Sequence, residues 1–167
     1  MQMITSEAEL LNYLQQQEIS YLRIEHPPVF TCEEAETYRP KTESVSTKNL
    51  FLQDKHGSSF MLMTDCDKRT NLKALGIKIG AAKLQLGSEE KMWELMRVNR
   101  GAVTVLGLIN DVHHQVQLLI DEDIWKEENF LCHPLVNTST LVLAKKDLIN
   151  FLKLSGHDAN IVPVPTR

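Results

Sequence analysis

The chain of 167 residues has no long apolar run and no leader-like N-terminus. No stretch approaches the roughly 20 apolar residues that a membrane-spanning helix requires. The first residues, MQMITSEAELLNYL, contain no basic segment followed by a continuous apolar core, so they are not typical of a signal peptide. These two absences favour a cytoplasmic protein that does not enter membranes.

The sequence also lacks the common motifs of nucleotide, metal and serine-hydrolase chemistry. Neither glycine-rich phosphate loop, G-x-x-x-x-G-K-[ST] or G-x-G-x-x-G, is present, and H-E-x-x-H and G-x-S-x-G are absent as well. His113 and His114 precede a predicted strand, where neighbouring side chains diverge and make poor joint metal ligands. Asp65 and Asp67 fit a loop turn better than a metal pair. We therefore expect no metal and no cofactor.

Cysteines are few and widely spaced. Cys32, Cys66 and Cys132 are odd in number and form no C-x-x-C pair. This pattern argues against a zinc site or a disulfide framework and suits a reducing compartment. We expect three free thiols.

The composition is that of an ordinary globular protein, with 43% hydrophobic and 24% charged residues. A chain of this length suits one domain, here residues 1–167. The net charge of −4 is unevenly distributed, because residues 39–100 hold 12 Lys/Arg against 7 Asp/Glu and the remainder holds 6 against 15. A local positive field fits contact with a short stretch of phosphate backbone. A chance fluctuation on solvated faces is the alternative.

Apolar periodicity predicts helices and strands along the whole chain. Ser6 with Glu9 and Thr31 with Glu34 match the capping box that marks a helix start. Turn residues at 54–57 predict a hairpin. The remaining predictions are strands at 21–25, 45–53, 59–64, 78–86, after Gly101, at 116–121 and at 140–144, and helices at 71–75, from Ser88 towards Gly101, and around 148–156.

Three short segments carry candidate site residues. His133 precedes Pro134 within LCHPLVNTST, a segment whose small polar side chains can satisfy backbone groups and hold the imidazole in place; a histidine that bonds only locally is the alternative. Lys48 and Asn49 are neighbours in a predicted strand, so both can serve one site only if the strand starts, bulges or twists there. The backbone amides near Gly101 could face a ligand, although a helix-terminating turn is the simpler interpretation.

Taken in order, the segments KNLFL at 48–52, GAVT at 101–104 and CHPLVNTST at 132–140 resemble the YbaK/ProX family. More narrowly, the chain looks like the free-standing prolyl-tRNA editing proteins of the ProXp-ala or PrdX group. The resemblance implies a single α/β domain with a mixed, mostly antiparallel curved or barrel-like sheet flanked by helices. It also implies a trans-acting hydrolase that deacylates mischarged aminoacyl-tRNA, above all alanyl-tRNA(Pro), with prolyl-tRNA synthetase as a further partner and no role for DNA.

The resemblance assigns a role to each candidate residue. Lys48, Asn49 and His133 would be catalytic: Lys48 as the cation that meets phosphate or oxyanion, Asn49 as a hydrogen-bonding group, and His133 as the group that orients the aminoacyl ester. Gly101, Ala102 and Cys132 would bind substrate. A rival mechanism, with Cys132 as nucleophile and His133 as base, needs a geometry that immediate neighbours seldom have.

One position departs from the family pattern. Val105 stands where the family loop G-x-x-x-P has proline, which bears on the rigidity of the loop. A non-catalytic module of the same fold, which binds tRNA ends or aminoacyl nucleotides, is therefore the alternative function.

Overall fold

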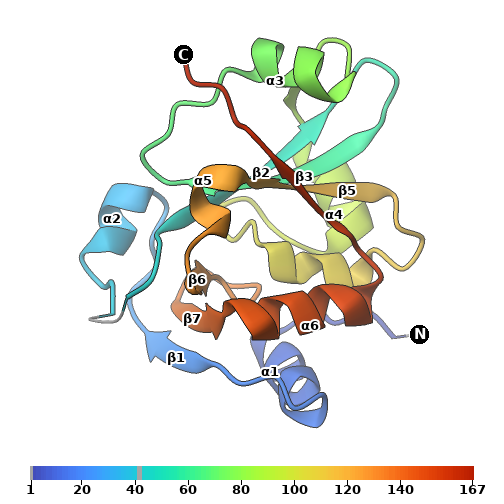
Figure 1. The fold of residues 1–167 in the computed structure, drawn as a ribbon. Helices are drawn as coiled ribbons and strands as arrows, with labels where there is room; N and C mark the ends of the chain where they lie inside the picture. The colour runs from blue at the N-terminus through green and yellow to red at the C-terminus, as the bar shows by residue number, and fades with distance from the viewer. Residues whose placement is uncertain (1, 41–42) are drawn as a thin grey trace.

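The chain forms two β-sheets with helices around them (Figure 1). The computed structural model describes residues 2–40 and 43–167. One sheet has three strands in the order β1-β7-β6, and the other has five in the order β4-β2-β3-β5-β8. The strands are β1 Leu22–Glu25, β2 Thr47–Gln53, β3 Ser59–Asp65, β4 Gln85–Leu86, β5 Val116–Asp121, β6 Asn129–Cys132, β7 Ser139–Ala144 and β8 Ala159–Val162. The helices are α1 Glu7–Gln16, α2 Cys32–Glu36, α3 Leu72–Ile79, α4 Glu89–Met96, the 3-10 helix η1 Val105–Asn110, α5 Glu122–Trp125 and α6 Lys145–Ser155.

The pairing within the sheets confirms the predicted fold class. All pairs of the three-stranded sheet are antiparallel. In the five-stranded sheet, β2 pairs antiparallel with β3 and β4, whereas β5 pairs parallel with β3 and β8. The fold is thus a mixed α/β domain, with the strands divided between two sheets. Among the described residues, no helix is long and apolar enough to cross a membrane.

The five-stranded sheet is buried on both faces, because successive side chains of a strand point to opposite sides. Phe51, Met61 and Met63 face the larger core together with side chains of α1, α4 and α6. Leu52 and Phe60 face a smaller core under α3. In Figure 1, α3 accordingly lies on one side of β2 and β3, and α6 on the other.

Three predicted helix starts are confirmed by their caps. The Ser6 hydroxyl accepts the Glu9 amide at 3.2 Å, and the Thr31 hydroxyl accepts the Glu34 amide at 3.1 Å. Ser88 caps α4 in the same way. Each hydroxyl satisfies a backbone donor that the first helical turn leaves unpaired, so the local sequence was sufficient to locate these ends.

The segment 71–86 differs from the prediction. The helix does not end at Gly76 but continues to Gly80, which adopts φ +74° as a left-handed cap. A Cβ on Gly76 would lie 2.6 Å from the Ala81 carbonyl oxygen, so this glycine permits close packing instead of ending the helix. Only Gln85–Leu86 of the predicted strand 78–86 is a strand. The predicted strand after Gly101 is the 3-10 helix η1, and β6, α5 and β8 were not predicted.

The prediction of three free thiols is wrong. Cys32 and Cys66 form a disulfide, with Cα atoms 5.9 Å apart, and only Cys132 is free. The two cysteines are separated by 34 residues, so sequence spacing gave no signal of their proximity. The cross-link ties the first residue of α2 to the residue that follows β3. The cysteine pattern therefore no longer supports a reducing compartment.

Candidate active site

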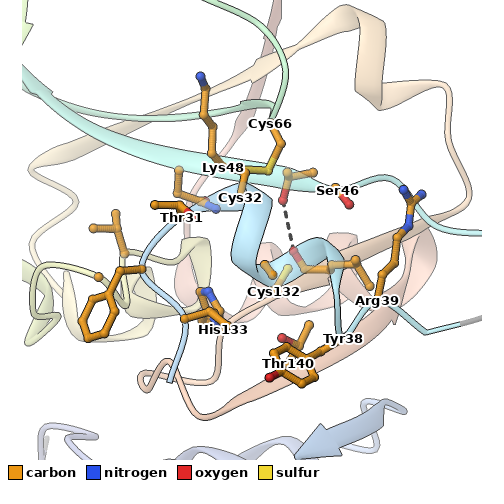
Figure 2. Close-up of a pocket in the computed structure, with 18 of the residues that line it drawn as sticks. Thr31, Cys32, Tyr38, Arg39, Ser46, Lys48, Cys66, Cys132, His133 and Thr140 are labelled. Atoms are coloured by element: carbon orange, nitrogen blue, oxygen red, sulfur yellow. Dashed lines mark hydrogen bonds between the residues drawn. A yellow bond between two sulfur atoms is a disulfide. The ribbon is translucent and has the colours of Figure 1, made fainter. Parts of the chain in front are cut away.

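A cavity of about 250 Å³ opens between the two sheets, beneath α2 (Figure 2). Five of the six residues predicted for the site line it: Lys48, Asn49, Gly101, Cys132 and His133. They come from the start of β2, the loop before η1, the end of β6 and the segment that follows β6. The fold thus brings together side chains that are up to 85 positions apart in the sequence.

Lys48 and Asn49 both line the cavity, and both lie near the beginning of a strand. β2 starts at Thr47, and Lys48 pairs with Thr64 and Asn49 with Met63 in a regular ladder without a bulge. The regular pairing leaves the strand start and a local twist as the ways in which these neighbouring strand residues can share a site.

The Lys48 ammonium points away from His133 in this structure (Figure 2). Its Nζ donates a hydrogen bond of 2.5 Å to the Lys68 carbonyl oxygen. Burial lowers the pKa of Lys48, while the nearby carboxylates of Asp65 and Asp67 act in the opposite direction. The lysine stem lines the cavity, and its charge is held at the rim beside an acidic loop.

That rim loop is firmly anchored. Lys68 forms ion pairs of 2.8 Å with Asp121 and Asp123, and Asp121 is fully buried. The Thr64 hydroxyl donates to the same Asp121 carboxylate at 2.6 Å. Asp65 accepts the Asp67 amide at 2.8 Å, as expected for a loop turn. Among the described residues, no group of three or more His, Cys, Asp or Glu has the arrangement of a metal site.

Asn49 presents an unsatisfied acceptor. Its side-chain oxygen Oδ1 is buried and has no hydrogen-bond partner among the described residues. Burying such an oxygen without a partner costs about 1–3 kcal/mol, so a ligand or water that donates a hydrogen bond here would be stabilised. Asn49 thus combines a buried acceptor that lacks a partner with a place in the cavity lining.

The imidazole of His133 is held by one bond and exposes its other nitrogen. Its Nδ1 lies 3.2 Å from the Ser139 carbonyl oxygen, which can only accept, so Nδ1 carries the proton. Burial lowers the pKa of His133, and the neutral ring is favoured. The Nε2 lone pair is then an acceptor on the wall of the cavity.

Cys132 is an apolar wall residue in this geometry. Its side chain is buried, and burial raises the pKa of the thiol to about 12, so it stays protonated at neutral pH. The proton-bearing Nδ1 of His133 is bonded to a carbonyl group and not to the thiol. Both facts argue against Cys132 as a nucleophile with His133 as its base.

The loop at 101–104 contributes Gly101 but not Ala102. Gly101 adopts φ +88°, and a Cβ at this position would lie 3.4 Å from the exposed ring of Phe30. The Ala102 amide donates to the Asn99 carbonyl at 3.1 Å, and Ala102 is absent from the cavity lining. The backbone amide of Ala102 is thus engaged within the turn, and its part in substrate binding stays a prediction.

Val105, the departure from the family loop, is the first residue of η1 and is fully buried. The Thr104 hydroxyl caps this helix by accepting the Leu106 amide at 3.2 Å. Proline is favoured at the first helical position because its missing N–H is not needed there. Valine at the same place therefore keeps the helix start intact, and the cap and the core hold the loop.

Two further residues near the cavity were not predicted. The ring of His26 is buried and lies 2.8 Å from the hydroxyl of Thr140, a residue that lines the cavity. The Tyr38 ring stacks on His26 with centroids 5.5 Å apart. His26 precedes two prolines in the sequence, and nothing in that local pattern indicates the partner 114 residues away.

Taken together, fold and site define a small α/β domain whose cavity lies between a cationic rim and a neutral wall. Comparison with known proteins gives the family. A model of the aminoacyl-tRNA editing domain matches residues 26–151. The chain therefore belongs to the aminoacyl-tRNA editing domain family, a family of aminoacyl-tRNA deacylases, as the resemblance implied.

Individual relatives agree with this family. The chain is 34% identical over 145 residues to the prolyl-tRNA editing protein ProX of Acetoanaerobium sticklandii, covering 86% of this chain and 88% of the relative. It is 34% identical over 151 residues to the prolyl-tRNA synthetase associated domain-containing protein 1 of Danio rerio, covering 89% and 82%. A crystal structure described as a candidate trans-editing enzyme for prolyl-tRNA synthetase superposes with a TM-score of 0.72 at 16% identity, over 98% of this chain and 99% of that chain.

Proposed function

We propose that this protein hydrolyses the ester bond of mischarged alanyl-tRNA(Pro) as a trans-acting editing enzyme. The observation that carries the proposal is that Lys48, Asn49, Gly101, Cys132 and His133 line one cavity of about 250 Å³. A cavity of this size suits a small aminoacyl group. The names of the relatives, which refer to prolyl-tRNA editing and to prolyl-tRNA synthetase, support tRNA(Pro) as the carrier.

Hydrolysis of the aminoacyl ester requires little more than correct positioning of the substrate and the water. An aminoacyl ester is already activated, so positioning and charge stabilisation account for most of the rate. Water attacks the ester carbonyl, the tetrahedral oxyanion collapses, and the ribose oxygen leaves with a proton. The products are the free amino acid and a tRNA with both terminal hydroxyls. A ribose hydroxyl of the substrate can assist the water, so the protein does not need a strong general base.

The side chains divide this work. The unsatisfied Oδ1 of Asn49 accepts a hydrogen bond from the attacking water or from the terminal ribose. Lys48 exchanges the Lys68 carbonyl for the terminal phosphate or the oxyanion, a stronger partner for an ammonium group. His133 faces the aminoacyl group with its neutral ring, and Cys132 limits the space for the side chain.

Substrate and partners follow from this assignment. Phosphate contacts come from the basic segment 39–100, of which Lys41 lies outside the described residues. The partners are aminoacyl-tRNA and prolyl-tRNA synthetase, with no role for DNA, membranes, a metal or a cofactor. Because aminoacyl-tRNA is made and used in the cytoplasm, we assign the protein to that compartment.

A panel of aminoacyl-tRNAs tests the proposal directly. The purified protein is incubated with alanyl-, seryl-, cysteinyl- and prolyl-tRNA(Pro) and with alanyl-tRNA(Ala), and release of the amino acid is followed under single-turnover conditions. We expect rapid release from alanyl-tRNA(Pro), undiminished after exhaustive chelation of metals, and little release from prolyl-tRNA(Pro). Binding of tRNA without any release would instead support the non-catalytic module.

A further inference from the structure

The hydrogen bonds of His26 fix the direction in which the Thr140 hydroxyl donates. His26 Nδ1 lies 2.8 Å from the Pro27 carbonyl oxygen, which can only accept, so Nδ1 carries the proton of the neutral ring. The lone pair of Nε2 then accepts the Thr140 hydroxyl at 2.8 Å. Since the Thr140 proton is used in this bond, the oxygen offers only lone pairs to any other partner.

The ring of His26 is held in place by its surroundings. His26 is 7% exposed, and its ring is stacked on Tyr38 and lies edge-on to His133 at 6.4 Å between centroids. Its own amide donates to the Thr138 carbonyl at 3.0 Å, which ties the end of β1 to the start of β7. Thr140 lines the cavity, and this contact with His26 makes its oxygen an acceptor of fixed direction there.

A second fixed acceptor lies on the same wall. The proton of His133 is committed to the Ser139 carbonyl, which leaves Nε2 with a lone pair and, among the described residues, without a hydrogen-bond partner. The two cations that line the cavity have their charged groups bonded elsewhere: Lys48 to the Lys68 carbonyl, and Arg39 to Glu36 and the Ser44 carbonyl. This wall thus offers two acceptors and no competing positive charge.

A primary ammonium group is the chemical group that suits such a wall, because it has three donors, no acceptor and a positive charge. We propose that Thr140 and His133 bind the α-amino group of the aminoacyl ester, and that His26 is the positioning residue that turns the Thr140 lone pairs towards it. The inference rests on the proposed function and narrows its substrate class. The protein acts on esters with a free α-amino group and rejects N-acylated ones, such as peptidyl-tRNA.

Two stable probes isolate this contact from hydrolysis. One is 3′-deoxy-3′-(alanylamino)adenosine, an amide that cannot be hydrolysed as the ester is, and the other is its N-acetyl derivative. We expect the wild-type protein to bind the free-amine probe about tenfold to a hundredfold more tightly, the factor associated with a hydrogen bond to a charged group. Equal binding of the two probes, or no binding of either, overturns the inference.

Variants assign the preference to the named residues. In Thr140→Val, which keeps the shape but removes the acceptor, the preference should fall to a few-fold, and Thr140→Ser should retain it. His26→Phe should match Thr140→Val, and the double variant should lose nothing further, because His26 acts through Thr140. The ratio between the probes separates this role from a merely structural one, which would weaken both probes equally.

Thr70→Val is the matched control, since Thr70 is also a buried threonine, does not line the cavity, and has a hydroxyl without a partner among the described residues. It should leave the preference unchanged. If His26→Phe fails to fold, Thr140→Val and Thr140→Ser still test whether the Thr140 oxygen binds the amino group. A preference that survives in Thr140→Val would refute the assignment, and its loss in Thr140→Ser would do so as well. Because the probes report binding alone, a protein that prefers the free amine yet hydrolyses no ester would contradict only the proposed function.

Discussion

The two walls of the cavity differ in charge and in the way they are built. The wall from the three-stranded sheet is neutral, with Cys132 as a protonated thiol and His133 and Thr140 as acceptors. The wall from the five-stranded sheet carries Lys48 and is braced by the buried ion pair of Lys68 with Asp121. The difference suggests a division of labour in which one sheet recognises the amino acid and the other recognises the nucleotide.

The two sheets pack against one hydrophobic core, which includes Phe51 of β2 and Phe130 of β6, and a few polar contacts join them beside the cavity. The Thr47 hydroxyl donates to the Leu131 carbonyl at 3.0 Å, and Val45 forms an isolated bridge with Phe130. Outside these contacts, the disulfide ties α2, which covers the cavity, to the end of β3 on the charged side (Figure 2). The disulfide, the charged wall and the neutral wall can therefore be perturbed one after another.

The largest effect is expected from removing the disulfide. By chain entropy, a cross-link that closes a loop of 34 residues stabilises the fold by about 3–4 kcal/mol. Cys32→Ser with Cys66→Ser should lower the free energy of unfolding by this amount in urea titrations. Dithiothreitol should have the same effect on the wild type and none on the variant. A wild type that is insensitive to the reductant would show that the walls are held together without the cross-link.

Lys48 tests the charged wall. Loss of a cation that fixes phosphate or oxyanion should cost about 3 kcal/mol, or about a hundredfold in rate. Lys48→Ala should therefore fold normally, within about 0.5 kcal/mol, and deacylate poorly. Lys48→Arg should retain much of the tRNA binding with impaired turnover, since the planar guanidinium binds phosphate but cannot occupy the same point.

Single-turnover deacylation and thermal unfolding of both variants give the readout. Lys153→Ala is the matched control, because this exposed lysine lies on α6, outside both the cavity and the basic segment 39–100. Rates close to wild type in Lys48→Ala would remove Lys48 as the cation of the site and favour the binding module.

Cys132 tests the neutral wall as a size filter. A single small group in an apolar pocket discriminates by about 1–3 kcal/mol, so Cys132→Ala should narrow the preference for alanyl over larger esters by roughly tenfold. The comparison requires kcat/KM for alanyl-, seryl- and cysteinyl-tRNA(Pro). If the ratios do not change, Cys132 is only a core residue.

The residues that sequence reasoning found and missed differ in the range of their interactions. Caps such as Ser6 and Thr31 act over three positions, so local pattern located them. Resemblance to the family supplied Lys48, Asn49 and His133, which the fold then brought to one cavity. His26 could not be found in this way, because its partner Thr140 lies 114 residues away and only the pairing of β1 with β7 brings them together.

The disulfide was missed for a related reason. Cys32 and Cys66 have no diagnostic spacing, and an odd count of cysteines argued against pairing. Only the packing of α2 against the end of β3 reveals the pair.

The smallest effect concerns the charge state of His133. Burial lowers its pKa in the folded protein, so the unfolded chain binds a proton more readily. Stability is therefore lost as pH falls below the ordinary imidazole range near 6.5, down to the lowered folded value, with a slope of at most about 1.4 kcal/mol per pH unit. Above that range, the contribution is constant.

His133→Gln isolates this contribution from the other titrating groups, because glutamine can still donate to the Ser139 carbonyl but does not titrate. Urea unfolding of both proteins at pH 8.5, 7.5 and 5.5 gives the difference in free energy. The difference in free energy of unfolding between the two proteins should be the same at the two higher pH values. At pH 5.5 the wild type should be less stable relative to the variant than it is at those values. A shift in favour of the wild type would mean that the ring is charged in the folded protein. The wall that we describe as neutral would then carry a cation and would repel the ammonium group that we assign to it.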